Sequence, residues 1–404
     1  MYKVAFLVPR ILKGSGGHRT IFQHAYSLKS VGCEIHIYIE GAGNSARASA
    51  EIAQQFGYDF NNVHFGWESV RPAELVFATA WNSARYVRDI AFSCRKAYFV
   101  QDLESAFCPA GDSFLRAENS YTYGLSVVTI GRWLQRELEV RFGTKGEHFD
   151  FCADTSIYHP VTRPDRPPSI CFIYQPDKPR RCGRIGIDAL GIVKHVLPDA
   201  KIYLYGSPKN VAGNIWFEHE NLGLLSPADC NRLYNSCSVG LCLSASNTSR
   251  IPFEMMASGL PVVELWRENN LYDLPEGAVS LSEQSPESIA ENLIRLLKAP
   301  AIRESMSEAG VHYMQGRDKR AELAQFQAIV LRLLSGRGAE PLAKTSRSYT
   351  SPPIVAGECV VAPDLPSEIR HRLRAGSASR IDAMPGYMQN FIRWGGARLR
   401  AYIG

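Results

Sequence analysis

Residues 244–263 read SASNTSRIPFEMMASGLPVV, and this stretch decides how the second half of the chain folds. It begins as a polar loop, and Pro252 stands in what would be the first turn of a helix, where proline is tolerated. Gly259 is typical of a helix end, and the residues after it return to a β-rich run. We therefore predict a loop, a helix at Ile251–Ser258 and a strand at Pro261–Glu264. The N–H groups at the helix start are placed to hold a phosphate.

Glu254 gives this predicted helix a chemical role. It lies in the first turn, where its carboxylate would reach a ribose hydroxyl of a nucleotide whose phosphates lie at the helix start. The backbone N–H groups at Arg250 and Ile251 would then contact the phosphates. The alternative is a carboxylate that only stabilises the positive end of the helix dipole.

The rest of the second half alternates strands with helices. We predict strands at Ser169–Tyr174, Lys201–Tyr205 and Val239–Leu243, and helices at Gly186–His195, Pro227–Ser236, Pro286–Leu297 and Ile302–Leu334. Such alternation is typical of a parallel sheet covered by helices on both faces. Ligands of these sheets bind at the carboxyl ends of the strands.

The first half repeats this pattern after a continuous apolar strand at the N-terminus. We predict strands at Tyr2–Val8, Glu34–Ile39, Leu75–Ala78, Ala97–Val100 and Ser126–Ile130, and helices at His18–Val31 and Arg132–Phe142. A proline-rich stretch near Tyr158–Ser169 has the composition of a linker. The fold class is therefore α/β, with two doubly wound Rossmann-like domains at residues 1–163 and 164–335 that face each other across a cleft.

Two segments at predicted strand ends favour a phosphate-bearing ligand. The loop Gly14–His18 follows the first strand, and its glycines let backbone N–H groups approach an anion; a simple tight turn is the alternative. It fits neither a dinucleotide fingerprint nor a P-loop, which argues against a nicotinamide enzyme and a P-loop ATPase. The segment Lys178–Arg184 carries four cations in seven residues. It suggests a diphosphate, with a solvated basic loop as the alternative.

Composition places the excess charge in the C-terminal tail, residues 336–404. From residue 343 onward there are nine basic and four acidic residues, which accounts for the chain's net charge of +5. A neutral body argues against nucleic-acid binding. We expect the tail to be loosely packed over residues 336–385. Tyr387–Tyr402 is a candidate amphipathic segment for a membrane surface, with packing on the body or disorder as the alternative.

The remaining composition indicates a cytoplasmic protein. The ten cysteines show no zinc-ligand spacing, and several lie in apolar runs, which is typical of buried free thiols in a reducing compartment. We expect neither a secretory leader nor a transmembrane helix.

The motif IPFEMMASGLPVV, the loop Gly14–His18 and the segment Phe149–Pro160, with Asp154 and Tyr158 in place, resemble the retaining GT-B glycosyltransferases, family 4 in particular. The resemblance covers residues 1–335. Tyr98–Glu104 and the Asn247–Pro252 loop look closest to rhamnosyltransferase-like members that build bacterial surface polysaccharides. The implied activity is metal-independent transfer of a sugar, with rhamnose from a dTDP donor as the narrower expectation, to a saccharide or lipid-linked saccharide acceptor. No further cofactor is implied.

The resemblance also implies roles for individual residues. Arg181 and Glu254 are the expected catalytic residues. The expected donor-binding residues are Gly16, Gly17, Arg184, Ser249, Arg250, Ile251, Gly206 and Gly223. The expected acceptor-binding residues are His18, Gln101, Asp102 and Glu104. Arg181 and Arg184 receive the phosphate role by position alone, because the family's usual arginine and lysine are not in register.

One position departs from the family pattern. Many members place a second glutamate eight residues before the helix glutamate, and here that position is Ser246. This departure leaves open a non-catalytic binding protein with a degenerate site. A nucleotide-sugar epimerase, which shares the fold, is the other alternative.

Overall fold

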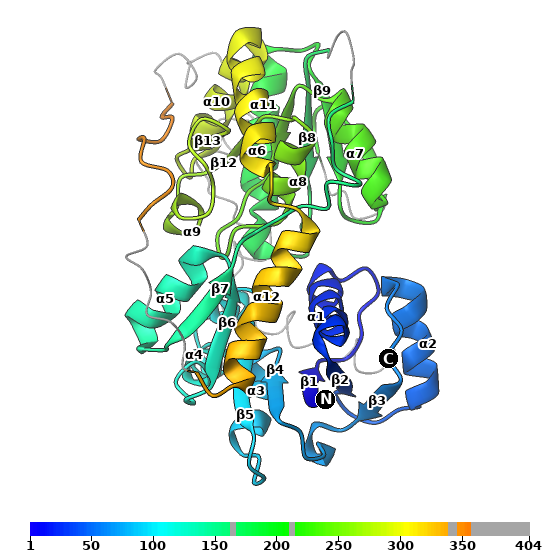
Figure 1. Cartoon of the computed structure of the whole chain (residues 1–404). Helices are drawn as coiled ribbons and strands as arrows, with labels where there is room; N and C mark the ends of the chain where they lie inside the picture. Colours follow the sequence, from blue (N-terminus) through cyan, green and yellow to red (C-terminus); the bar gives the residue numbers. More distant parts are fainter. Residues whose placement is uncertain (162–166, 210–214, 338–345, 357–404) are drawn as a thin grey trace, which may run out of the picture.

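The computed structural model describes residues 1–161, 167–209, 215–337 and 346–356, which form two α/β domains, one above the other (Figure 1). Among these residues, seven parallel strands form the first sheet in the order β3-β2-β1-β4-β5-β6-β7. The strands are β1 Tyr2–Val8, β2 Cys33–Ile39, β3 Asn62–Phe65, β4 Leu75–Ala78, β5 Arg95–Val100, β6 Ser126–Ile130 and β7 Gly146–Phe149. The helices are α1 Gly16–Ser27, α2 Ser45–Phe56, α3 Trp81–Arg88, α4 Asp112–Ser120 and α5 Arg132–Phe142, with short 3₁₀ turns η1 Leu28–Val31, η2 Trp67–Ser69 and η3 Glu104–Phe107.

The second domain contains six parallel strands in the described residues, in the order β10-β9-β8-β11-β12-β13. They are β8 Ser169–Ile173, β9 Lys201–Tyr205, β10 Glu220–Gly223, β11 Val239–Leu241, β12 Val262–Leu265 and β13 Val279–Ser282. The other elements are η4 Pro179–Arg181, α6 Gly183–Val196, α7 Pro227–Ser236, α8 Ile251–Ala257, α9 Glu268–Leu271, α10 Pro286–Lys298, α11 Pro300–Met314 and α12 Lys319–Leu334. The predicted fold class is thus confirmed.

The central strands of both sheets are covered on both faces. Every residue from Val4 to Val8 is fully buried, as are Ile170, Cys171 and Phe172 of β8. Strands buried on both faces read as continuous apolar runs, because neither face meets water. This burial explains why the central strands were readable from the sequence.

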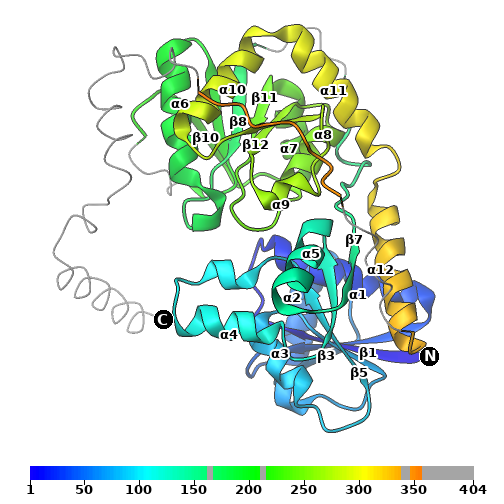
Figure 2. The ribbon, with the colours of Figure 1, turned by 90° about the vertical axis from the view of Figure 1, so that its left-hand side faces the viewer.

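The predicted helix Ile302–Leu334 is wrong as a single element. The chain forms α11, leaves the helix around Gly316, and restarts as α12, whose first turn is capped by the Asp318 side chain at 2.8 Å from the N–H of Ala321. The helix α12 runs from the second domain down along the first (Figure 2). Its Phe326 ring lies 5.4 Å from Phe99, between ring centroids.

This crossing changes the division of the chain into domains. The predicted second domain, residues 164–335, includes α12, whereas the structure packs α12 against α1 and β7 of the first sheet. The apolar face of α12 decides this, because its buried residues Phe326, Ile329 and Val330 belong to the core of the first sheet. The chain therefore crosses between the domains near residues 150–161 and again near residues 315–318.

Asp273 joins the domains at a second place. Its carboxylate accepts hydrogen bonds from the backbone N–H groups of Arg132, at 2.7 Å, and Trp133, at 3.2 Å. These N–H groups begin α5, so a residue of the second domain caps a helix of the first. Burial raises the pKa of Asp273 to about 6.

Residues 346–356 pack on the second domain, which corrects part of the loose packing expected for residues 336–385. Tyr349 is buried, and its N–H donates to the carbonyl of Leu271 at 3.0 Å. Ile354 forms a bridge to Ser282 at the end of β13. Edge strands leave backbone groups unpaired, and this segment satisfies some of them. Residues 357–404, including the candidate amphipathic segment Tyr387–Tyr402, lie outside the described residues.

Across the part of the chain that the structure describes, no helix combines the length and the apolar character needed to cross a bilayer.

Candidate functional site

The candidate site begins where the strand order of the second sheet reverses, between β8 and β11. In open parallel sheets this is where a crevice forms at the carboxyl ends of the strands. The turn η4 after β8 carries Arg181, and the loop after β11 begins at Ser244. The guanidinium of Arg181 donates a hydrogen bond to the Ser244 hydroxyl at 2.6 Å. Arg181, an expected catalytic residue, therefore lies at the switch point of the second sheet.

Glu254 lies in α8, on the helix that follows the same loop, and is partly buried. Burial raises the pKa of its carboxyl to about 7, opposed by the positive charge of Arg250, a hydrogen bond with the Tyr158 hydroxyl and the charge of Arg19. Arg19 belongs to the first turn of α1 in the other domain. The helix that begins at the glycine loop thus faces Glu254 across the domains.

The Arg250 side chain is engaged inside the protein. Its guanidinium makes two hydrogen bonds of 2.6 Å with the carboxylate of Glu322 in α12. The same carboxylate lies 3.0 Å from Nε2 of His24 in α1. The charge of Arg250 is therefore already neutralised, and the expected phosphate contact is left to its backbone N–H. The N–H of Ile251 is also engaged, by the Ser249 hydroxyl at 3.3 Å.

Three expected acceptor-binding side chains are engaged inside the protein. The carboxylate of Asp102 accepts from the N–H of Asn247, across the domains, at 2.8 Å. Glu104 accepts from the N–H of Trp81 at 2.7 Å, and only 7% of it is exposed. The His18 ring is buried and lies 3.0 Å from the Ser15 hydroxyl.

The physical reason for this correction is burial. A polar side chain that follows a strand end either faces the cleft or turns inward, and sequence does not distinguish the two. Of the four expected acceptor residues, Gln101 is placed differently, because it is partly exposed and lies against Gly17. Its amide atoms are 3.8 Å from where a Cβ of Gly17 would stand.

The glycines expected to bind the donor fall at strand ends. Gly206 and Gly223 follow β9 and end β10, and the N–H of Gly206 donates to the carbonyl of Gly223 at 2.9 Å. Their φ angles are +97° and +74°, in the region that side chains disfavour. Gly16 and Gly17 begin α1, with Ser15 as its N-cap. The two pairs lie on different domains, which is the arrangement a ligand between the domains requires.

Arg184, an expected donor-binding residue, lies on α6 in an ion pair with Asp188 at 3.5 Å, and half of its side chain is exposed.

Two other arginines lie near the switch point of the second sheet, and the sequence did not suggest a role for either. Arg180 pairs with Asp102 at 3.5 Å and stacks on Phe107, both from the first domain. Arg267, two residues after β12, reaches the carbonyl of Ala245. The only sequence signal for Arg267 was its place after a strand end.

Ser246 is nearly completely buried, and its hydroxyl has no hydrogen-bond partner among the described residues. Buried hydroxyls without partners are uncommon, and one beside the switch point of the sheet is suited to a ligand hydroxyl.

The described residues contain no group of three or more His, Cys, Asp and Glu side chains placed to hold a metal ion.

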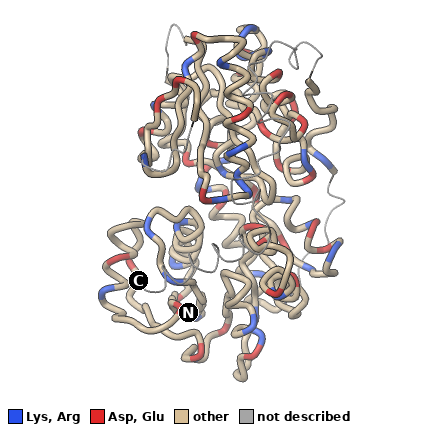
Figure 3. Tube along the Cα trace, turned by 180° about the vertical axis from the view of Figure 1, so that it is seen from behind, with Lys and Arg blue, Asp and Glu red and all other residues tan. Residues whose placement is uncertain are grey.

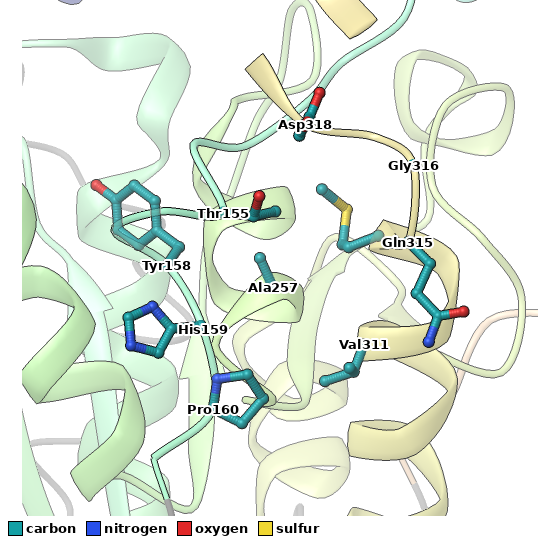
Figure 4. A pocket seen from close by; sticks show the side chains of 10 residues that line it. Thr155, Tyr158, His159, Pro160, Ala257, Val311, Gln315, Gly316 and Asp318 are labelled. Atoms are coloured by element: carbon teal, nitrogen blue, oxygen red, sulfur yellow. The ribbon is translucent and has the colours of Figure 1, made fainter. Parts of the chain in front are cut away.

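A separate cavity of about 270 Å³ lies where the chain crosses between the domains (Figure 4). Its walls come from residues 155–160 and from the end of α11, with Ala257 of α8 at its base. Tyr158 borders it and also shares the hydrogen bond with Glu254. The expected donor-binding residues do not line this cavity.

The buried carboxyl of Glu104 predicts how stability depends on pH. Burial raises its pKa to about 8 from the ordinary value of 4.5. The stability it contributes is complete below about pH 4.5 and is lost as the pH rises through about 8. Glu104→Gln, which keeps an acceptor for Trp81, should therefore match the wild type at pH 4 and exceed it at pH 9 by about 3–5 kcal/mol in urea unfolding.

Glu139→Gln on the exposed face of α5 is the matched control for Glu104→Gln and should change stability equally at both pH values. Equal stability of Glu104→Gln and wild type at pH 9 would mean that Glu104 ionises without cost.

Comparison with known sequences gives two matches. A family model described as the WsaF C-terminal domain matches residues 168–294. The O-antigen biosynthesis protein RfbC of Myxococcus xanthus is 29% identical over 281 residues, which is 67% of this chain and 21% of RfbC. The chain therefore spans about a fifth of the length of that curated relative.

Comparison with solved structures identifies the architecture. Anabaena HepE in complex with UDP and glucose is similar with a TM-score of 0.63 and 14% identity, over 83% of this chain and 100% of HepE. WaaG, a glycosyltransferase involved in lipopolysaccharide biosynthesis, is similar with a TM-score of 0.59 and 13% identity, over 81% of this chain and 99% of WaaG. At this level of identity the likeness shows the fold, which is that of GT-B glycosyltransferases.

Proposed function

We propose that this chain is a glycosyltransferase that takes a sugar from a nucleoside diphosphate donor bound between its two domains. The observation that carries the proposal is the pairing of Arg181 with Ser244 at the point where the second sheet reverses its strand order. Glu254 follows on the same loop and helix, opposite the glycine-rich start of α1. A cation, a carboxylate and a glycine loop around one crevice suit a diphosphate, a ribose and a sugar.

The proposed chemistry is electrostatic. When the bond between sugar and phosphate breaks, negative charge develops on the leaving diphosphate, and Arg181 stabilises it. Glu254 accepts hydrogen bonds from the ribose hydroxyls and holds the nucleotide in register. Gly16 and Gly17 let the backbone of α1 approach the donor closely. The buried hydroxyl of Ser246 is available to a hydroxyl of the transferred sugar.

We further propose the finer assignments that the sequence suggested. They are a dTDP-rhamnose donor, retention at the anomeric carbon without a metal ion, and a saccharide or lipid-linked acceptor in surface-polysaccharide synthesis. The matched relative RfbC is described as an O-antigen biosynthesis protein, which supports the acceptor class. A cytoplasmic site of action, with membrane contact through the tail, completes the proposal.

The first test is calorimetric titration with dTDP, UDP, GDP and ADP. One nucleotide should bind with micromolar affinity, and it identifies the base of the donor. A preference for dTDP supports rhamnose, and a preference for UDP or GDP removes that assignment. No binding by any of the four would contradict the proposed function.

Glu254 predicts how this binding depends on pH. Because its pKa is raised to about 7, the carboxylate is mostly protonated at pH 6 and mostly ionised at pH 8. The ionised form is the better acceptor for ribose hydroxyls, so the affinity should rise by about fivefold to tenfold over this range. Glu254→Gln and Glu254→Ala should bind weakly at both pH values. A pH-independent affinity in the wild type would exclude Glu254 from ribose binding.

A non-catalytic nucleotide-binding protein is the second candidate, and Ser246 in place of the family's glutamate favours it. Transfer to acceptor decides between the two, using the nucleotide sugar whose base the titration selects. Nucleotide binding without transfer to acceptor or water would favour the binding protein. Release of an isomerised sugar nucleotide without acceptor would instead indicate an epimerase.

A further inference from the structure

A second arginine approaches the loop that Arg181 contacts. Arg181 bonds to Ser244, and Arg267 donates to the carbonyl of the next residue, Ala245, at 3.4 Å. Both positive charges lower the pKa of the same thiol, Cys182, although burial raises it overall to about 11. Both guanidinium groups therefore contact the same short stretch of loop, Ser244–Ala245.

The position of Arg267 follows from the sheet. It comes two residues after β12, whose parallel partner β11 leads into Ser244. Its other terminal nitrogen donates to Gln284, two residues after β13, at 2.6 Å. The side chain thus lies along the carboxyl edge of three neighbouring strands, the edge where ligands of such sheets bind. Figure 3 shows lysine and arginine segments at the junction of the two domains.

The charges at this edge are not balanced within the protein. The Nε group of Arg267 is buried and has no hydrogen-bond partner among the described residues. The neighbouring carboxyl group, Glu264, is fully buried, which raises its pKa to about 8 and leaves it mostly protonated at neutral pH. Asp102, an acid of the first domain, is paired with Arg180. Arg181 and Arg267 are partly buried, and charges withdrawn from water are normally paired, so two arginines beside a neutral carboxyl group suit an anion that completes the site.

Residues 346–356 hold the backbone that follows Arg267 in place. The next residue, Glu268, forms an ion pair with Arg347 at 2.7 Å, and Leu271 accepts from Ser348 and Tyr349. Residues 346–356 therefore brace the short helix that Arg267 precedes. A braced arginine loses little freedom when a ligand binds, which favours tight recognition.

We propose that Arg267 is a second diphosphate-binding residue, which acts with Arg181 and makes the site select two phosphates over one. This inference rests on the proposed function for the nucleotide, but the anion site itself does not. Two guanidinium groups that approach from β8 and from β12 suit the two phosphates of a nucleoside diphosphate, because each forms paired hydrogen bonds with phosphate oxygens.

The test compares a nucleoside diphosphate with the monophosphate of the same base by calorimetry. Arg267→Gln should lower the affinity for the diphosphate by about tenfold to 100-fold and the affinity for the monophosphate by less than about threefold. Arg295→Gln is the matched control, because Arg295 bonds to Ser280 and Asn292, near the amino end of β13, and also has a buried Nε without partner among the described residues. It should bind both ligands as the wild type does. An equal loss of both ligands, or no loss, overturns the proposal.

A second variant separates binding from folding. Arg267→Lys keeps the charge and should recover most of the diphosphate affinity that Arg267→Gln loses; no recovery in a protein with the wild-type unfolding midpoint overturns the proposal. Inorganic diphosphate then separates the inference from the proposed function. If the wild type binds inorganic diphosphate through Arg267 but no nucleotide, the anion site stands and the glycosyltransferase proposal fails. If the wild type and Arg267→Gln bind a nucleotide with the same affinity, the glycosyltransferase proposal stands and the proposed role of Arg267 fails.

Discussion

Arg181→Ala should lower the rate of sugar transfer by about 100- to 1000-fold, the cost typical of removing one preorganised group that stabilises charge in a transition state. Arg181 is held by Ser244 at the switch point of the second sheet, so its guanidinium is oriented before substrate arrives. The measurement is the initial rate of transfer with the nucleotide sugar that the titration selects. Because the charge develops as the bond breaks, the loss should appear in kcat more than in KM.

The matched control for Arg181→Ala is Arg232→Ala on α7. Arg232 is largely exposed and pairs with Asp229 on the same helix, so its loss should leave the rate within about twofold of the wild type. A rate within tenfold of the wild type for Arg181→Ala would remove Arg181 from the mechanism.

Glu322→Ala should destabilise the protein by about 3–5 kcal/mol, the cost of leaving a buried charge without its partner. The carboxylate is almost completely buried and accepts two hydrogen bonds from Arg250, with His24 beside it. Despite burial, which alone would raise its pKa, the charge of Arg250 and the hydrogen bonds from His24 and Arg250 lower it to about 2. Removing the carboxylate leaves Arg250 charged at the start of the loop that leads to Glu254.

The lowered pKa of Glu322 also predicts how its contribution to stability changes with pH. The depressed pKa means that Glu322 contributes stability above about pH 4.5 and loses it as the pH falls through about 2. The difference between Glu322→Ala and wild type in denaturant unfolding should therefore shrink between these values. Glu308→Ala, on the exposed side of α11, is the control and should stay within about 0.5 kcal/mol of the wild type. A cost below about 1 kcal/mol for Glu322→Ala would show that Arg250 finds another partner.

The sequence predicted the fold well where local pattern and burial agree. Tyr2–Val8 and Arg132–Phe142 have the predicted bounds. The first is a strand whose last five residues are fully buried, and the second is an amphipathic helix that ends at a glycine. The strands at the sheet margins, β3, β7, β10 and β13, were missed, because each has only four residues and carries polar side chains. The break between α11 and α12 was missed because the apolar spacing continues across it, although each helix packs on a different domain.

The candidate site was also predictable only in part. The loop before α8, Arg181 and the glycine pairs could be named from the sequence, because each stands directly after a strand and strand ends share one edge of a parallel sheet. The internal partners of the Asp102, Glu104 and Arg250 side chains could not be identified from the sequence. Their partners Asn247, Trp81 and Glu322 lie 145, 23 and 72 residues away in the sequence.

The sequence by itself thus determined two doubly wound domains, a crevice at their strand ends and the helix that carries Glu254. These depend on short-range periodicity, on glycine and proline positions, and on the rule that parallel strands end at one edge. Only the tertiary structure decided which charges remain available to a ligand. That outcome depends on distances between side chains from both domains, and on the burial that neutralises Glu264 while Arg250 is paired and Arg267 is left partly unpartnered. Pairing and burial are properties of packed neighbours, which the order of residues does not encode locally.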